Sequence, residues 1–303
     1  MRVLAIGECM AELAPTETQG DYRLGFAGDT FNTAWYLARM HPDIAVSYLT
    51  AVGDDAISQQ MLDFIAASGI ETRHIQTAKN QTVGLYLISL HNGERSFSYW
   101  RGQSAARQLA QDSVALRQAM DRSDLVYFSG ITLAILDTAS RQNLLDAIQV
   151  ARANGKTVAF DPNLRPRLWT DTLEMTDAIM QGAAVSDIAL PSFEDEALWF
   201  ADADPQATAE RYLAAGANTV VVKNGPEPVY FQQGETAGTL AVPALTRIID
   251  TTAAGDSFNA EILAGLSNGT PLTNSIASAC ALAGRVVQSK GALVSVDRSE
   301  FYP

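Results

Sequence analysis

Short apolar runs and helix-length segments alternate along most of the chain, and this alternation narrows the possible folds more than any other feature. Helical spacing of apolar residues is found over residues 55–68 and 138–153, which are followed by Gly69 and by Asn154-Gly155. Glycine commonly follows the last turn of a helix, and continuous short apolar runs are typical of strands buried on both faces. The apolar runs are residues 3–7, 46–52, 125–130, 157–161 and 219–222. The sequence therefore predicts an α/β fold with a central, mostly parallel sheet flanked by helices.

Length and composition fit a single large domain. The chain has 303 residues, 47% of them hydrophobic, and its mean hydropathy is +0.01. A chain of this length can bury a full core. No internal repeat or low-complexity linker interrupts it, so we expect one domain over residues 1–303 with a small embellishment.

The charge and the cysteines limit the partners and the compartment. A net charge of −13 argues against nucleic acid and anionic membrane as partners, because a phosphate polymer needs a basic surface. An anionic ligand must therefore find local cations. Cys9 and Cys280 lie in apolar surroundings without Cys-x-x-Cys spacing, which predicts buried thiols in a reducing compartment. The N-terminal segment MRVLAIGECM is too short an apolar run for a signal peptide, so we expect a cytoplasmic protein.

Residues 83–101 differ in kind from the rest of the chain. Two alternating runs, VGLYLISL and RSFSYWR, flank an Asn-Gly pair, which is a strong β-hairpin signal. Phe97, Tyr99 and Arg101 share one side of the return strand, and Tyr86 lies on the facing strand. A hairpin inserted in a βα series is a candidate lid, and we expect segments 9–26 and 83–101 to form it. Aromatic residues on a strand face are more often core or interface than ligand contacts, but Arg101 on that face favours a binding role.

The segment Ile249–Gly265, IDTTAAGDSFNAEILAG, predicts an anion site. Small residues at 253–255 leave backbone amides uncovered before an apolar, helix-spaced run that starts near Ser257. Uncovered amides and the positive end of a helix dipole attract oxygen-rich anions. Asp256 stands at the edge of this site. One interpretation is that it accepts a proton from a hydroxyl while the amides hold a phosphoryl group; the other is that it only caps the helix.

The same residues carry a family resemblance. Residues 250–258, DTTAAGDSF, resemble the signature D-T-x-G-A-G-D of the ribokinase-like (PfkB) sugar kinases, in which the last Asp is the catalytic base. The resemblance implies a ribokinase-like fold with a β-sheet lid, ATP and Mg²⁺ as cofactors, Asp256 as the base, and Ala253, Ala254 and Gly255 as its catalytic neighbours. Ala253 replaces the first Gly of the signature. Because Ala avoids positive φ, this replacement predicts an ordinary backbone conformation at residue 253.

Four further motifs follow the family's order along the chain. An N-terminal G-G-x-x-x-N motif corresponds to Gly28, Asp29 and Asn32, in a helix that Asp29 or Thr30 can cap, and the resemblance implies that these residues contact the sugar. The other motifs lie in DPNLRPRLW (161–169), PSFEDE (191–196) and KNG (223–225).

The last three motifs imply a nucleotide site. Ligands of open α/β sheets bind at the carboxyl ends of strands, where Asp161, Asn163 and Arg165 are expected. The resemblance assigns Asn163, Arg165, Ser192, Lys223, Asn224, Gly225, Ala253 and Gly255 to the nucleotide, with Arg165 also reaching the substrate. Relatives have Asn-x-x-Glu where this chain has Ser192-x-x-Asp195. Because of this departure the sequence does not decide whether Asp195, Glu194 or neither of them helps to bind the metal. The small-residue helix at 271–290 implies that Cys280 and Ala283 lie near the base.

The expected activity is phosphorylation of the terminal hydroxyl of 2-keto-3-deoxygluconate. A neutral hexose would leave the guanidinium groups of Arg101 and Arg165 without a partner, whereas a sugar acid offers a carboxylate that fits the planar fork of Arg. The segments around Tyr86 and Tyr99 also resemble the ketodeoxygluconate kinases within the family. The alternatives are a kinase for fructose or ribose and a non-catalytic sugar- or nucleotide-binding protein. Because relatives bury the lid face against a second subunit, a homodimer is expected.

Overall fold

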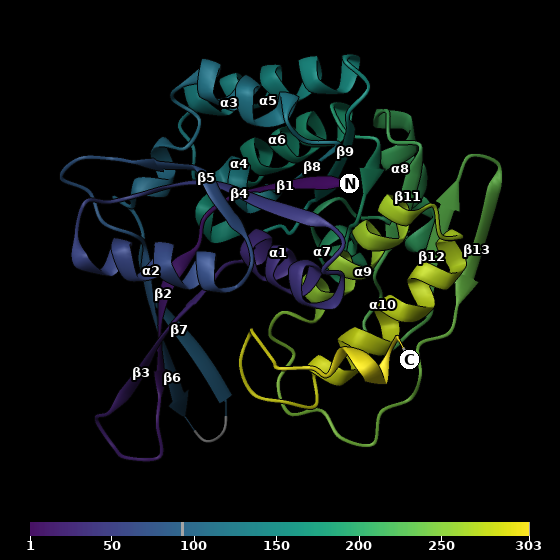
Figure 1. Cartoon of the computed structure of the whole chain (residues 1–303). Coiled ribbons are helices and arrows are strands. Elements are labelled where there is room, and N and C mark those ends of the chain that lie inside the picture. The colour runs from purple at the N-terminus through teal and green to yellow at the C-terminus, as the bar shows by residue number, and fades with distance from the viewer. Residues whose placement is uncertain (92–93, 303) are drawn as a thin grey trace.

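A large sheet forms the centre of the computed structural model, which describes residues 1–91 and 94–302 (Figure 1). Within these residues the sheet has nine strands in the order β13-β12-β11-β10-β9-β8-β1-β4-β5. All neighbouring pairs from β11 to β5 are parallel, and β12 and β13 add an antiparallel edge. The strands are β1 (Arg2–Ile6), β4 (Ala45–Val52), β5 (Glu71–Thr77), β8 (Leu125–Ser129), β9 (Thr157–Asp161), β10 (Ile188–Ala189), β11 (Thr219–Val222), β12 (Val229–Gln233) and β13 (Thr236–Leu240). The predicted fold class is confirmed.

Helices cover both faces of this sheet (Figure 1). One face carries α1 (Asp29–Met40), α2 (Ala56–Ala67), α9 (Ala254–Asn268) and α10 (Leu272–Val286). The other carries α3 (Ser113–Asp121), α4 (Gly130–Ala134), α5 (Thr138–Ala153), α6 (Thr172–Ala184), α7 (Phe193–Trp199) and α8 (Pro205–Ala215). Residues 3–6 of β1 are apolar because the strand is buried on both faces. Val3 and Ala5 pack on the side of the first group of helices, and Leu4 and Ile6 pack on the side of the second group.

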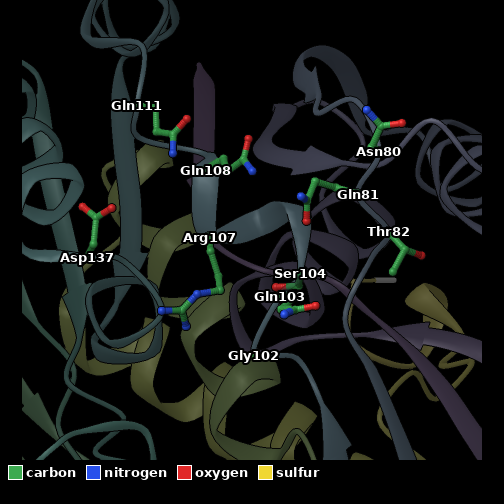
Figure 2. A pocket seen from close by; sticks show the side chains of 10 residues that line it. All are labelled: Asn80, Gln81, Thr82, Gly102, Gln103, Ser104, Arg107, Gln108, Gln111 and Asp137. Carbon is green, nitrogen blue, oxygen red and sulfur yellow. The ribbon is translucent and has the colours of Figure 1, made fainter.

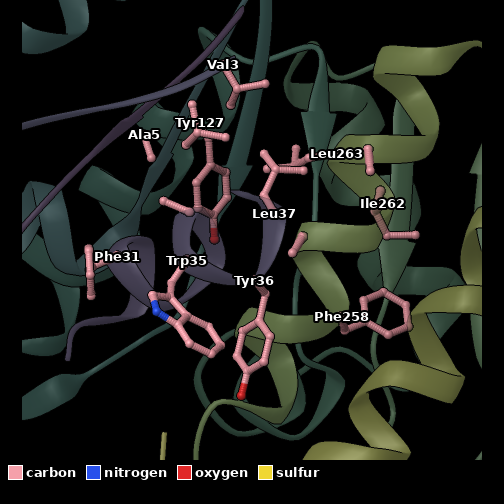
Figure 3. Close-up of a cluster of buried hydrophobic side chains, with 14 of the residues drawn as sticks. Val3, Ala5, Phe31, Trp35, Tyr36, Leu37, Tyr127, Phe258, Ile262 and Leu263 are labelled. Carbon is pink, nitrogen blue, oxygen red and sulfur yellow. The ribbon is translucent and has the colours of Figure 1, made fainter. Parts of the chain in front are cut away.

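Helix α1 packs against both the sheet and the neighbouring α9, and this packing positions the site described below. Figure 3 shows Phe31, Trp35 and Leu37 of α1 in one cluster with Phe258 and Ile262 of α9. Each large apolar side chain buried in this way contributes about 1.5–3 kcal/mol to stability. The first turns of the two helices are therefore held in a fixed relation.

A second, smaller sheet extends from the main body at the lower left of Figure 1. Its order is β3-β2-β6-β7, with β2 (Met10–Pro15), β3 (Tyr22–Ala27), β6 (Leu85–His91) and β7 (Glu94–Trp100). These strands arise from the two segments that the sequence indicated. The predicted Asn92-Gly93 turn lies outside the described residues.

The two faces of the small sheet have different surroundings. Phe97 and Tyr99 share one face, as predicted, and Tyr86 lies on the same face, with the three ring centroids 5.9–6.2 Å apart. On that face Tyr86 belongs to a buried cluster that also contacts Ala253, directly before α9. The opposite face carries apolar side chains that are partly or largely exposed: Leu13, Leu24, Leu85, Leu87 and Trp100. One face therefore looks toward the loop before α9, and the other is an exposed apolar surface.

Some predictions of local structure need correction. Helix α1 begins after Gly28 with no side-chain cap, so the predicted cap at Asp29 or Thr30 is wrong. The last long helix ends at Val286 rather than at residue 290. Cys9 and Cys280 are free and buried, as predicted. In the part of the chain that the structure describes, no helix has both the length and the apolar character needed to cross a membrane.

Candidate active site

Buried polar side chains gather where the parallel strands end. Asp161 is the last residue of β9, and Lys223 follows β11. Lys223 Nζ donates to Asp161 Oδ2 at 3.0 Å and to Asn259 Oδ1 at 3.2 Å, and Asn259 Nδ2 donates to Asp161 Oδ2 at 2.6 Å. The carboxyl edge of an open α/β sheet is where ligands bind. This triad therefore forms the floor of a candidate site.

The backbone before α9 is unusual. Ala253 has φ 61° and ψ 14°, in the left-handed region, so the predicted ordinary conformation at this residue is wrong. Asp250 holds the preceding turn, since its Oδ1 accepts from Thr252 N and its Oδ2 accepts from Gly291 N. The left-handed conformation costs a residue with a Cβ about 1–2 kcal/mol. The turn that Asp250 holds therefore imposes the left-handed conformation on Ala253, although the residue type alone predicted another conformation.

The start of α9 has the form of an anion site. Within the described residues, the backbone amides of Gly255 and Asp256 have no hydrogen-bond acceptor. A methyl group placed on Gly255 would lie 3.7 Å from Lys223 Nζ, so the amine is adjacent to this helix terminus. Uncovered amides, the helix dipole and a lysine together favour a phosphoryl group. The predicted anion site thus has a structural basis, with Lys223 as an added cation.

Asp256 is not a helix cap. The N-cap of α9 is Ala253, which makes no side-chain capping bond, so the capping interpretation is wrong. Asn32 Nδ2 donates to Asp256 Oδ2 at 2.8 Å, and Gly28 N donates to Asn32 Oδ1 at 3.3 Å. Thr33 Oγ1 donates to the Asp256 carbonyl at 3.1 Å. The side chain of Asp256 is therefore oriented by α1.

The surroundings of Asp256 favour its protonated form. Burial and the nearby carboxylates of Asp29 and Asp161 raise its pKa to about 8, against the opposite effects of the Asn32 hydrogen bond and of Lys223. A group with a pKa close to the working pH can both accept and release a proton efficiently.

Asn163 and Arg165 join the site from the loop after β9. Asn163 has φ 35°, and its Nδ2 donates to Asp29 Oδ2 at 2.8 Å. Arg165 is 52% exposed, and its Nη1 lies 3.7 Å from Asp195 Oδ2. Burial raises the pKa of Asp195, and Arg165 opposes this shift. The loop after β9 thus links the N-terminal motif to the first turn of α7.

Arg101 is already paired. Its Nη2 donates to Glu8 Oε2 in a buried ion pair, in which the Arg101 side chain is 12% exposed and the Glu8 side chain 1%. The expectation that Arg101 and Arg165 lack partners is therefore wrong, because Glu8 and Asp195 balance their charges. Neither arginine contacts the other among the described residues. A preference for a sugar acid must rest on the donor geometry of these arginines rather than on unbalanced charge.

The loops after β10 and β11 lie side by side. Phe193 N donates to the Lys223 carbonyl at 2.8 Å, and Ser192 forms a β-bridge with Lys223. In the same loop Gly225 has φ 57°, and the Asn224 carbonyl accepts from Glu227 N at 3.0 Å. These residues form one continuous edge beside the start of α9.

The residues predicted near the base lie on α10. Cys280 is 5% exposed in the hydrophobic core, and burial raises its pKa to about 11. Ala283 is partly buried and packs against the same core. The Cys280 thiol therefore serves packing, and Ala283 is the more accessible of the two.

A polar cavity of about 660 Å³ lies beside the segment that follows Arg101 (Figure 2). Its lining residues are Asn80, Gln81, Thr82, Gly102, Gln103, Ser104, Arg107, Gln108, Gln111 and Asp137. Ser104 also donates its hydroxyl to Glu8 Oε1 at 2.5 Å. Ser104 therefore connects the wall of the cavity to the ion pair of Glu8 and Arg101 through one hydrogen bond.

Reasoning from the sequence missed Glu8, Asn259 and Tyr127. Asn259 Nδ2 donates to Tyr127 OH at 3.1 Å, which links the floor of the site to β8. A polar residue in the apolar run of α9, three residues after Asp256, is a signal that could have identified Asn259. Glu8 follows the first buried strand at its carboxyl end, the edge of the sheet at which a site is expected, and this placement is a signal that could have identified it. No three His, Cys, Asp or Glu side chains gather as a metal site in residues 1–91 and 94–302.

Comparison with known proteins agrees with this geometry. Residues 1–298 match the family described as pfkB family carbohydrate kinase. The chain belongs to this family.

Two relatives and one solved structure are informative. The chain is 38% identical over 305 residues to a 2-dehydro-3-deoxygluconokinase of Dickeya dadantii and 39% identical over 303 residues to one of Escherichia coli K12, with 97% of each chain covered in both cases. The crystal structure of a 2-dehydro-3-deoxygluconokinase from Thermotoga maritima matches with a TM-score of 0.86 at 21% identity, over 99% of this chain and 97% of that one. The structural match supports the fold, and the sequence matches support the family.

Proposed function

We propose that the protein transfers the γ-phosphoryl group of ATP to the terminal hydroxyl of 2-keto-3-deoxygluconate, giving 2-keto-3-deoxy-6-phosphogluconate and ADP. The observation that carries the proposal is the Asp256 carboxylate, which Asn32 holds beside the uncovered amides of α9. The two relatives that bear this activity in their names support the substrate.

Asp256 is the general base of this reaction. The substrate hydroxyl oxygen forms a bond to the γ-phosphorus, the bond from that phosphorus to the β–γ bridging oxygen breaks, and ADP leaves with the electron pair. The hydroxyl proton passes to the Asp256 carboxylate. The amides of Gly255 and Asp256 and the Lys223 amine stabilise the negative charge on the transferred group.

The sugar acid lies under the small sheet, which acts as a lid. Gly28, Asp29 and Asn32 bind its hydroxyls, Tyr86 and Tyr99 cover it, and Arg101 and Arg165 bind its carboxylate. The contact of the Tyr86 cluster with Ala253 supports this placement, because it puts one face of the lid against the start of α9.

The nucleotide lies along the edge formed by the loops after β9, β10 and β11. Its contacts are Asn163, Arg165, Ser192, Lys223, Asn224, Gly225, Ala253, Gly255 and the α10 residues Cys280 and Ala283. Mg²⁺, when bound, would neutralise the charge of the nucleotide phosphates. Asp195 or Glu194 can reach it through water.

We further propose a cytoplasmic homodimer. The two buried free thiols fit a reducing compartment. The exposed apolar face of the small sheet fits a second copy, since an unpaired apolar sheet face is otherwise a liability.

A kinase for a neutral sugar is the second candidate, because Glu8 and Asp195 already balance the two arginines. The decisive experiment incubates the protein with ATP, Mg²⁺ and 2-keto-3-deoxygluconate and examines the product by phosphorus–proton correlated NMR. We expect phosphorus coupling to the protons of the terminal carbon only. A phosphate at another position, or no ADP release with any sugar tested, contradicts the proposal.

A further inference from the structure

Glu8 is buried between Gly28, directly before α1, and Gly84, directly before β6. It follows β1 and is 2% exposed. On one side its backbone meets Gly28, where an added methyl group would lie 2.1 Å from the Glu8 carbonyl oxygen. On the other side its side chain meets Gly84, where an added methyl group would lie 2.6 Å from Oε1 and 3.3 Å from the Cβ of Arg101. A side chain at either position would clash with Glu8 as it is placed in this structure.

Among the described residues, the carboxylate of Glu8 has two hydrogen-bond partners, and both belong to the segment after β7. Arg101 Nη2 donates to Oε2 and Ser104 Oγ donates to Oε1. Figure 2 shows Ser104 on the segment that continues from Gly102. Glu8 thus fixes the end of the lid hairpin to the end of the first strand of the main sheet.

The Nε donor of Arg101 remains unused. Within residues 1–91 and 94–302, Arg101 Nε is buried and has no hydrogen-bond acceptor. A buried N–H without an acceptor is costly, and in native proteins such a group usually has a ligand, water or functional explanation. The guanidinium is therefore held on one side by Glu8 and still has a donor for another oxygen.

We propose that Glu8 is a positioning residue that orients Arg101 for the carboxylate of the sugar acid. The inference deepens the proposed function and rests on it. Glu8 does not touch the substrate; it fixes the guanidinium so that the remaining N–H groups face the acid. A positioned arginine loses less rotamer freedom when it binds.

The test uses a matched pair of substrates. 3-Deoxyfructose has a hydroxymethyl group where 2-keto-3-deoxygluconate has its carboxylate, so a defect in acid recognition affects only the acid. For Glu8→Ala we expect the KM of the acid to rise at least about tenfold, with the KM of ATP and of 3-deoxyfructose within about twofold of wild type. Glu8→Gln keeps an acceptor for Arg101 and should restore the acid KM to within about threefold.

A double-mutant cycle separates positioning from a general structural role. In the Arg101→Leu background, Glu8→Ala should change the acid KM by less than about twofold, because the group that it positions is absent. The proposal is overturned if the two substitutions raise the acid KM independently, so that their effects multiply. It is also overturned if Glu8→Ala raises the KM of the acid and of the neutral sugar equally. If Glu8→Ala does not fold, Ser104→Ala serves instead, and it should raise only the acid KM; an unchanged acid KM then overturns the proposal.

The same measurements distinguish a failure of the proposed function from a failure of the proposed role of Glu8. A wild-type enzyme that prefers fructose over the keto-acid contradicts the proposed function. Multiplicative effects in an enzyme that prefers the keto-acid contradict only the role of Glu8.

Discussion

Asn32 Nδ2 donates to Asp256 Oδ2 at 2.8 Å and so connects two helices whose residues are 224 positions apart in the sequence. Both residues lie in the first turn of their helices, α1 and α9, which are packed together on the same face of the sheet. The orientation of the proposed base is therefore set by helix packing.

Replacing Asp256 with Asn should remove the base and keep the shape of the site. We expect kcat to fall by about 10² to 10⁴, with the dissociation constant of ATP nearly unchanged, since Asp256 is assigned to proton transfer. Steady-state kinetics and nucleotide titration measure both quantities. Wild-type kcat in this variant would remove Asp256 from the mechanism.

The same variant should alter the dependence of stability on pH. The folded-state pKa of Asp256 is raised to about 8, so the folded protein binds this proton more tightly than the unfolded chain. The stabilisation is complete below the unfolded pKa near 3.8 and is lost as the pH rises toward 8, by at most about 1.4 kcal/mol per pH unit.

Asp256→Asn does not titrate, so its unfolding free energy relative to wild type should increase from pH 5 to pH 8. Urea unfolding of both proteins at each pH measures this difference. Asp146→Asn, at an exposed position of α5, is the control and should show no such trend. A difference that is constant over this pH range contradicts the raised pKa.

The fold was largely predictable because buried strands and amphipathic helices leave a local signal. Helix α5 coincides with the predicted range 138–153, and strand β9 with 157–161. The Ala253 conformation was not predictable, because it depends on a turn that Asp250 holds through Gly291, 41 residues away. Local propensity gives no information on such a distant constraint.

The site was predictable only in part. Asp256, Asn32 and Lys223 could be named because each lies in a short motif. The pairing of Arg101 with Glu8 joins residues 93 positions apart, and neither has a spacing that indicates the other. Charge partners of this kind follow from strand order and register, which the sequence does not specify residue by residue.

Ala253→Gly should be tolerated. Glycine relieves the left-handed strain of about 1–2 kcal/mol but increases the entropy of the unfolded chain by a similar free energy. We therefore expect a change in unfolding free energy below about 1 kcal/mol, and kcat within about threefold of wild type. Ala253→Val, which adds β-branching at positive φ, should destabilise clearly more. Equal stability of the glycine and valine variants contradicts the observed conformation.

The exposed apolar face of the small sheet should be the dimer contact. Trp100 is 61% exposed on that face. We expect a dimer at micromolar concentration in sedimentation velocity, and a monomer for Trp100→Arg, because a charge on an apolar interface is costly to desolvate. Leu173→Arg is the control, since Leu173 is 69% exposed on α6 of the main body. A dimer that survives in Trp100→Arg, or is lost in Leu173→Arg, places the contact elsewhere.

The central claim is that this site recognises a sugar acid, and the ratio of kcat/KM for 2-keto-3-deoxygluconate to that for 3-deoxyfructose tests it most directly. The two substrates differ only at the carboxylate, so the ratio isolates its recognition from every other contact. A charge-assisted hydrogen bond contributes about 1.5–3 kcal/mol, which corresponds to a ratio of about 10 to 200 in favour of the acid. We predict a ratio in this range, with fructose and ribose below the acid. A ratio near one, or a higher kcat/KM for fructose or ribose, would contradict the account.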